Sequence, residues 1–275
     1  MDPNLAEFGA EIRRSESEID LSRAALLIAR AEYPDLDLQR YLLQLQELTD
    51  GVRSEEWAGS PLKRLHRLRR FLFEKQGFRG NDADYYDPRN SFLNDVLDRR
   101  LGIPITLSLL FMEVGRRLAL PVEGIGLPGH FIVGFGTGDE RILLDPFNRG
   151  AILTPESCQT VVSRAIGRPV PLEAGHFVPV TARQLLARML SNLKAAYFKR
   201  EEWEKALGVL DRLLVLDPDS PGEGRDRGLV FAKLGKFPVA IALWERYLRQ
   251  QPEAPDAKSV RGNLRQVRQA LAALN

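Results

Sequence analysis

Cysteine is almost absent from this chain of 275 residues, which contains only Cys158. One thiol excludes an internal disulfide framework and any zinc site built from several cysteines, and it agrees with a reducing compartment. Apolar runs of roughly 18 residues are also lacking, and the N-terminal segment has no signal-peptide core. We therefore predict a cytoplasmic protein with no membrane contact.

Excess charge of either sign is lacking too. Lys and Arg total 39 and Asp and Glu total 37, a net charge of +2. Nucleic-acid binding usually requires a concentrated basic surface, so we expect no nucleic-acid partner. The three histidines show no metal-ligand spacing, and we expect neither a metal nor a cofactor. Glycines 124, 126 and 129 match G-x-G-x-x-G but run into a strand pattern, which disfavours a dinucleotide site.

Helical periodicity fills the first part of the chain. Apolar residues recur at helical spacing after Asp20, after Asp37 and after Ser60-Pro61, each of which is a good helix start. Residues 77–94 are rich in Gly, Asp and Asn and predict an ordered loop that feeds a short helix. Such a loop can line a site or form an elaborate turn, and both interpretations stay open.

The stretch 102–148 contains the candidate catalytic residues. Gly102-Ile103-Pro104 starts a helix, and Thr106 and Ser108 lie in its first turns, where the helix dipole stabilises an anion. Three short strands then follow, VEGIG, HFIVGF and RILLDPF, with a hairpin turn expected at 136–140 between the last two. Counting outward from that turn places His130 and Asp145 together, so the carboxylate would orient the imidazole.

Other polar residues are weaker candidates for the same groove. Asn94 follows the polar loop, and Glu113 interrupts the buried stripe of the central helix between Met112 and Val114. The competing interpretation of Glu113 is an exposed helix position. Cys158 lies in the first turns of a helix predicted over 154–166, and the simpler interpretation is a small, half-buried side chain.

A period of 34 residues appears after Ala187. Residues related by it are similar: Tyr197 and Phe231, Trp203 and Phe237, Ala206 and Ala240, Leu210 and Trp244, Pro218 and Pro252. This spacing indicates two tetratricopeptide repeats, followed by a capping helix over 256–274. Lys194 and Arg227 depart from the usual glycine and leucine. The stack either binds a protein or peptide or serves as a buttress.

The chain resembles the bacterial transglutaminase-like family with C-terminal tetratricopeptide repeats, the SirB-type proteins. The resemblance is carried by YYDPRNSFLNDVLDRRLGIPITLSLL, GLPGHFIVGF and LLDPFN. It implies an α+β, mostly helical fold, with a papain-like core and small antiparallel sheet in residues 1–175 and helical repeats in 182–275. The parent superfamily uses a Cys–His–Asp triad. His130 and Asp145 match two members, whereas residues 104–106 offer no cysteine.

Three functional hypotheses follow. The leading one is a pseudoenzyme, a catalytically silent regulatory protein that binds protein or peptide partners through its groove and repeats. The alternative is a hydrolase or acyltransferase that uses the hydroxyl of Thr106 or Ser108 with His130 and Asp145. The third is a scaffold with no open groove. The oligomeric state is left open by all three.

Overall fold

The structure is a computed structural model that describes residues 3–54, 57–138 and 141–273. The chain forms two compact units. One comprises Ala10–Met189, and the other combines the residues up to Gly9 with those from Leu190 onward. Each unit is considered by itself below.

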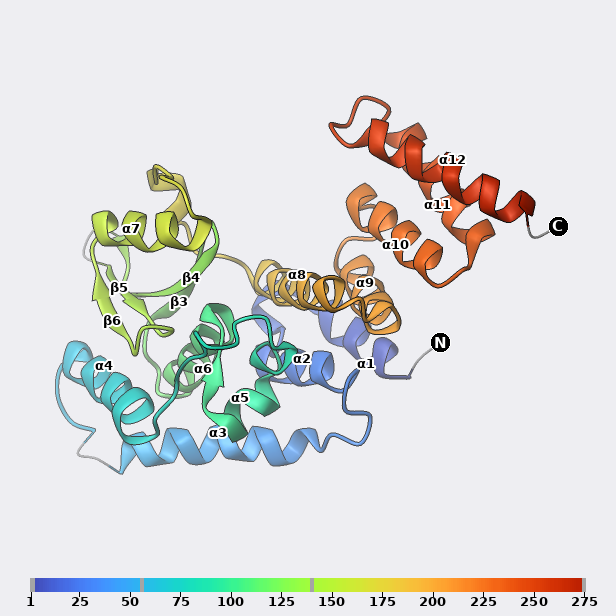
Figure 1. The fold of residues 1–275 in the computed structure, drawn as a ribbon. Helices are drawn as coiled ribbons and strands as arrows, with labels where there is room; N and C mark the ends of the chain where they lie inside the picture. Colours follow the sequence, from blue (N-terminus) through green and yellow to red (C-terminus); the bar gives the residue numbers. More distant parts are fainter. Residues whose placement is uncertain (1–2, 55–56, 139–140, 274–275) are drawn as a thin grey trace. The chain divides into compact units, whose positions relative to one another are not determined.

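Helices form the first layer of the Ala10–Met189 unit (Figure 1). They are α2 (Leu21–Ala29), α3 (Leu38–Arg53), α4 (Pro61–Arg70) and α5 (Leu93–Arg99), and a π-helical turn, Phe71–Lys75, extends α4. The three predicted starts are confirmed, since the side chains of Asp20, Asp37 and Ser60 each accept a hydrogen bond from a backbone N–H of the first turn. These caps satisfy donors that a helix start otherwise leaves free.

A four-stranded antiparallel sheet follows the central helix α6 (Pro104–Arg117). Its order is β3 (Val122–Leu127), β4 (His130–Phe135), β5 (Ile142–Asp145) and β6 (Ala151–Leu153). The three predicted strands and the β4–β5 pairing are confirmed, whereas the edge strand β6 was not anticipated. Of the predicted turn at 136–140, residues 139 and 140 lie outside the described residues.

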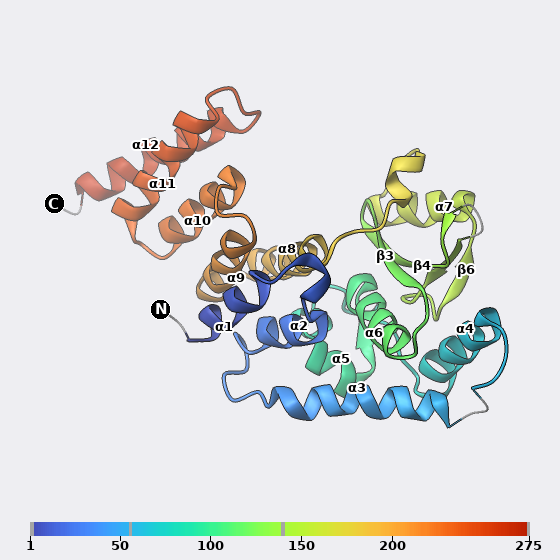
Figure 2. The ribbon, with the colours of Figure 1, turned by 180° about the vertical axis from the view of Figure 1, so that it is seen from behind.

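Helices cover both faces of this sheet. Helix α6 packs on one face and α7 (Pro155–Ile166) on the other (Figures 1 and 2). On the α7 side, Ile125, Ile132 and Leu143 form a buried cluster with Cys158 and Val162 of the helix. Every residue of β4 is buried as a result, which is why its sequence is continuously apolar rather than alternating.

Two very short parallel strands were not anticipated. Residues Arg79–Gly80 (β1) pair with Leu101–Gly102 (β2), directly before α6. This pairing holds both ends of the 81–100 segment, including a 3₁₀ turn at Pro88–Asn90, close to the start of α6. The polar loop predicted over 77–94 is therefore ordered.

The second unit is built from antiparallel helices. They are α8 (Ala182–Arg200), which begins within the first unit, α9 (Trp203–Leu216), α10 (Pro221–Lys233), α11 (Phe237–Gln250) and α12 (Ala257–Ala273), with the first residues of α1 (Pro3–Ile12). Trp244 is buried against Gly228, where a Cβ atom would lie 2.6 Å from the indole. The mostly helical fold with a small sheet and helical repeats is thus confirmed. No described helix has an apolar stretch long enough to span a bilayer.

Candidate functional site

His130 and Asp145 lie side by side, as their sequence spacing predicts. His130 begins β4 directly after the tight turn at Pro128-Gly129, and Asp145 ends β5, the neighbouring antiparallel strand. The His130 Nε2 atom lies 2.9 Å from Asp145 Oδ2, and both side chains are buried. The pair therefore fixes the orientation of the imidazole ring.

Asp145 is held as a carboxylate by several donors. Its Oδ1 accepts hydrogen bonds from the backbone N–H groups of Phe147 (3.0 Å) and Asn148 (3.3 Å), and its Oδ2 accepts one from Asn148 Nδ2 (2.7 Å). Burial raises the pKa of Asp145, but the hydrogen bonds from His130 and Asn148 outweigh burial and leave the pKa below its usual value.

The hydroxyl of Thr106, the candidate nucleophile, forms hydrogen bonds with backbone groups. Its hydroxyl donates to the carbonyl oxygens of Asn90 (2.6 Å) and Ile103 (3.1 Å) and accepts from the N–H of Ile103 (3.2 Å). The side chain is fully buried. Among the hydrogen bonds of the described residues, none joins Thr106 to His130.

Asn90 completes this framework, a role that the sequence did not indicate, since Asn90 was a candidate only for the cap of the short helix that begins at Leu93. Its Nδ2 donates to the Asp84 carbonyl (2.7 Å), and its Oδ1 accepts from Asn81 Nδ2 (3.0 Å). Together with the Thr106 bond, these contacts attach the polar loop to the first turn of α6. The density of Asn and Asp in this loop was the available signal.

The remaining predicted groove residues have different surroundings. Ser108 is buried, and its hydroxyl lies 3.4 Å from the Phe131 carbonyl. Asn94 is buried at the start of α5, and its Oδ1 has no hydrogen-bond partner among the described residues. Glu113 is buried rather than exposed, and its carboxylate binds Arg117 (2.8 Å) and the hydroxyl of Ser22.

Aromatic rings extend from His130 toward the surface. The Phe147 ring meets the His130 ring edge-on with centroids 6.1 Å apart, and Tyr85 packs against Phe147 at 6.1 Å. Tyr86 in turn packs against Tyr85. Tyr85 is 38% exposed and Tyr86 50% exposed, so part of this series faces solvent. We call Tyr85, Tyr86, Phe147 and His130 the aromatic patch.

Cys158 does not supply the missing thiol nucleophile. It is fully buried in the cluster beneath α7. Burial, together with the negative charges of Asp145 and Glu156, raises the pKa of its thiol to about 11. At neutral pH the group is a thiol and not a thiolate. No group of three or more metal-binding side chains converges among the residues that the structure describes.

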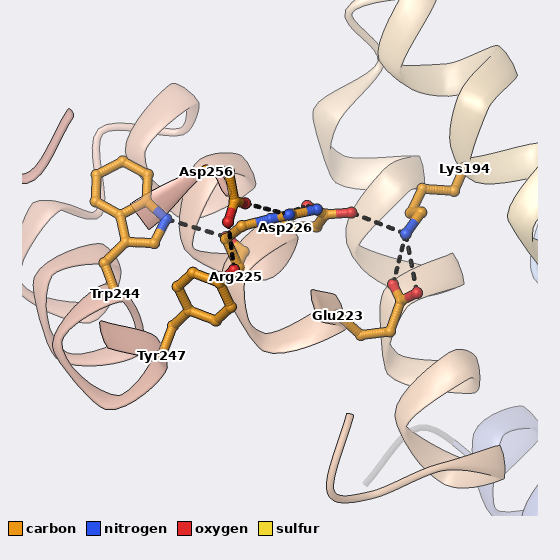
Figure 3. Close-up of polar contacts among 7 residues, drawn as sticks. All are labelled: Lys194, Glu223, Arg225, Asp226, Trp244, Tyr247 and Asp256. Atoms are coloured by element: carbon orange, nitrogen blue, oxygen red, sulfur yellow. Dashed lines mark hydrogen bonds and ion pairs between the residues drawn. The ribbon is translucent and has the colours of Figure 1, made fainter. Parts of the chain in front are cut away.

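The repeat unit contains a second set of polar contacts (Figure 3). Lys194 of α8 binds Glu223 (2.7 Å) and Asp226 (2.8 Å) of α10. Arg225 binds Asp226 and Asp256, and Asp256 also accepts a hydrogen bond from Tyr247 (2.5 Å). The network therefore joins α8, α10, α11 and the start of α12.

This network accounts for one departure from the usual repeat pattern. Lys194 stands where the pattern usually has glycine, and its ammonium group binds two carboxylates of the next repeat. The other departure, Arg227, binds Asp211 at 2.9 Å.

An open cavity of about 270 Å³ lies between the end of α9, the start of α10 and the end of α11. Leu214, Leu243 and Tyr247 contribute apolar surface to it, while Arg227 and Arg246 contribute positive charge. Arg246 is exposed and forms no ion pair with another described residue.

Comparison with known proteins reveals two sequence families. A profile of the transglutaminase-like superfamily matches residues 39–191, and a tetratricopeptide repeat profile matches residues 193–274. The chain is 40% identical to a UPF0162 protein of Xylella fastidiosa over 90% of both chains. It is 30% identical to a UPF0162 protein of Vibrio cholerae over 88% of both. It is also 32% identical to mouse F-box only protein 21, over 54% of this chain and 24% of that protein.

Proposed function

Because this chain belongs to the transglutaminase-like superfamily, among the bacterial UPF0162 proteins, we propose that it binds a protein or peptide partner without catalysing acyl transfer. The aromatic patch is the proposed contact surface of the first unit, and the cavity between α9, α10 and α11 that of the repeats. In this proposal the protein is a pseudoenzyme with a regulatory role, and its His130 and Asp145 shape a binding surface.

The proposal rests on one observation: the Thr106 hydroxyl forms its hydrogen bonds with backbone groups and none with His130 among the described residues. Nucleophilic catalysis requires a hydroxyl or thiol within hydrogen-bond reach of its base, about 2.6–3.2 Å. The Thr106 hydroxyl instead bonds to two backbone carbonyls, and Pro104 at the helix start has no nucleophilic group. The exposed rings of Tyr85 and Tyr86 provide the kind of aromatic surface that is enriched in protein interfaces.

The test uses the full chain with a photoreactive benzophenone residue at position 86, irradiated in a bacterial lysate. We expect cross-links to a specific partner segment from position 86. The control places the same residue at Ile152, which is 56% exposed on β6, and should give no cross-link to that segment. A third chain with the residue at position 246 tests the repeat cavity separately.

A catalytic assay addresses the opposing outcome. The purified chain is incubated with p-nitrophenyl acetate and digested for mass spectrometry. We expect no acyl group on Thr106 or Ser108. Acylation of either residue that disappears in His130→Ala would overturn the non-catalytic proposal in favour of a hydrolase or acyltransferase.

A further inference from the structure

Arg188 is fixed directly beside His130, although no sequence motif singled it out. It lies on α8, and its Nη2 atom donates hydrogen bonds to the carbonyl oxygens of Leu127 and His130, both at 2.6 Å. The guanidinium group also lies over the Phe131 ring, 5.6 Å from the centroid. These contacts hold the charge at the turn from which β4 and His130 begin.

The charge of Arg188 has no carboxylate partner among the described residues. Burial lowers the pKa of this guanidinium, and the neighbouring Tyr85 opposes the effect only in part. Arg188 is half-buried, and a charge that is partly removed from water is stabilised by an anionic partner. The two carbonyl oxygens solvate Arg188 but carry no net charge to neutralise it.

Arg183 of the same helix provides a direct comparison. Its guanidinium also donates to two backbone carbonyls, those of Ile12 (2.8 Å) and Arg14 (2.6 Å). In addition it binds the Glu16 carboxylate at 2.6 Å. Arg188 likewise bonds to two backbone carbonyls, but it has no carboxylate partner among the described residues. An anion from another molecule could take the place that Glu16 has beside Arg183.

The surroundings of Arg188 restrict the kind of anion. Arg188 is joined to the aromatic patch through His130, because it bonds to the His130 carbonyl oxygen while Phe147 meets the His130 ring and Tyr85 packs against Phe147. No hydrogen bond of the Tyr85 hydroxyl occurs within the described part of the chain. A ligand here meets a planar cation, a phenol and aromatic rings, which suits a carboxylate next to an apolar or aromatic group.

We propose that Arg188 binds the carboxylate of a peptide that occupies the aromatic patch. The inference rests on the proposed function and specifies its ligand chemistry. The Nη2 group of Arg188 is used by the two carbonyls, while its Nε and Nη1 groups donate to no other described group. Either of these two groups can donate a charge-assisted hydrogen bond to one carboxylate oxygen. The carboxylate belongs either to a chain end or to an Asp or Glu side chain.

Three short peptides test the proposal on the full-length protein at pH 7. They are acetyl-Tyr-Gly with a free C-terminal carboxylate, acetyl-Tyr-Glu-amide and the neutral acetyl-Tyr-Gly-amide. Binding is measured by NMR titration of the His130 ring and Arg188 Nε–H resonances. We expect at least one acidic peptide to bind about tenfold more tightly than the neutral one. The one that does so identifies the source of the carboxylate.

Variants separate charge recognition from a structural role. Arg188→Met should reduce the preference for the acidic peptide to less than about twofold, whereas Arg188→Lys should retain part of it. Arg183→Met is the matched control and should leave the preference unchanged. Thermal unfolding and the amide spectrum of each variant show whether the β3–β4 turn stays folded, and the wild-type comparison does not depend on any variant.

The outcomes distinguish this inference from the proposed function. Equal binding of all three peptides would overturn the role of Arg188 while leaving peptide binding at the patch intact. Absence of binding by every probe also overturns the inference, and the cross-linking from position 86 then decides the proposed function independently. Loss of the preference in Arg183→Met would show that the effect is not specific to Arg188.

Discussion

Thr106 shows at the residue scale how a position with catalytic potential contributes to folding. Its hydroxyl connects Asn90 of the polar loop with Ile103 at the start of α6. Thr106→Val keeps the shape but removes every one of these hydrogen bonds in a fully buried site. We expect a loss of about 1–3 kcal/mol in the free energy of unfolding, measured by urea denaturation.

Thr106→Ser is the matched control because it retains the hydroxyl and removes one methyl group. Thr106→Ser loses only the burial of one methyl group, which contributes about 1 kcal/mol. It should therefore lower the free energy of unfolding by less than Thr106→Val, which loses the hydrogen bonds. A Thr106→Val variant as stable as the wild type would contradict the structural role.

Asp145 gives a second prediction at the residue scale, a dependence on pH. Its folded pKa lies below the unfolded value, so the ionised carboxylate favours the folded state. This stabilisation is present above the unfolded pKa of about 3.9 and is lost as the pH falls through the folded pKa. Asp145→Asn should cost about 3 kcal/mol at pH 7, because it breaks a buried pair.

The measurement compares wild type and Asp145→Asn by urea denaturation from pH 7 down to about pH 3, just below the usual carboxyl pKa. The difference between them should be constant at neutral pH and shrink in the acidic part of the series. A difference that stays constant to the lowest pH would show that the charge of Asp145 contributes nothing.

At the scale of elements, the two-residue strand β1 helps to hold Phe147 beside His130. Gly80 donates a backbone hydrogen bond to the Phe147 carbonyl (3.1 Å), and a Cβ atom at Gly80 would lie 2.6 Å from the Phe147 ring. Gly80→Ala should displace Phe147 and cost about 1–3 kcal/mol. Because Phe147 contacts His130, the His130 ring resonances should shift as well.

Gly175 provides the control for this substitution. It has a negative backbone φ angle, and a Cβ atom there would meet nothing within 4 Å. Gly175→Ala should leave both the unfolding free energy and the His130 resonances nearly unchanged. If Gly80→Ala behaves in the same way, Phe147 is not held by β1.

At the scale of the whole molecule, the two compact units should respond to substitutions separately. Lys194→Met leaves Glu223 without its cation and Asp226 with Arg225 alone, and it should destabilise the repeats by about 1–2 kcal/mol. Its partners are distinct from those of Thr106. The effects of Lys194→Met and Thr106→Val should therefore add within about 0.5 kcal/mol in the double variant.

The effect of each substitution is measured by hydrogen exchange of amides in α6 and α10. This method reports on each unit separately, which is needed because a chain with two units need not unfold in a single step. Lys258→Met, at an exposed lysine of α12, is the control for removing a positive charge. Clear non-additivity would show that the two units are coupled energetically.

Much of the fold was predictable because its signals are local. Capping residues at Asp20, Asp37 and Ser60 indicate helix starts, and the 34-residue period indicates the repeats. The strands β1, β2 and β6 were missed because two or three residues carry no detectable periodicity. They form only where the rest of the chain supplies a partner strand.

The residue types at the site follow from the sequence alone. His130 and Asp145 are present, no cysteine occupies positions 104–106, and the strand spacing brings the pair together because antiparallel neighbours share an end. The contacts of the other groups, in contrast, became known only from the folded chain. Thr106 bonds to a loop 16 residues earlier, and Arg188 reaches His130 from 58 residues later. Such contacts depend on which distant backbone carbonyls folding brings within reach, and no local pattern specifies that.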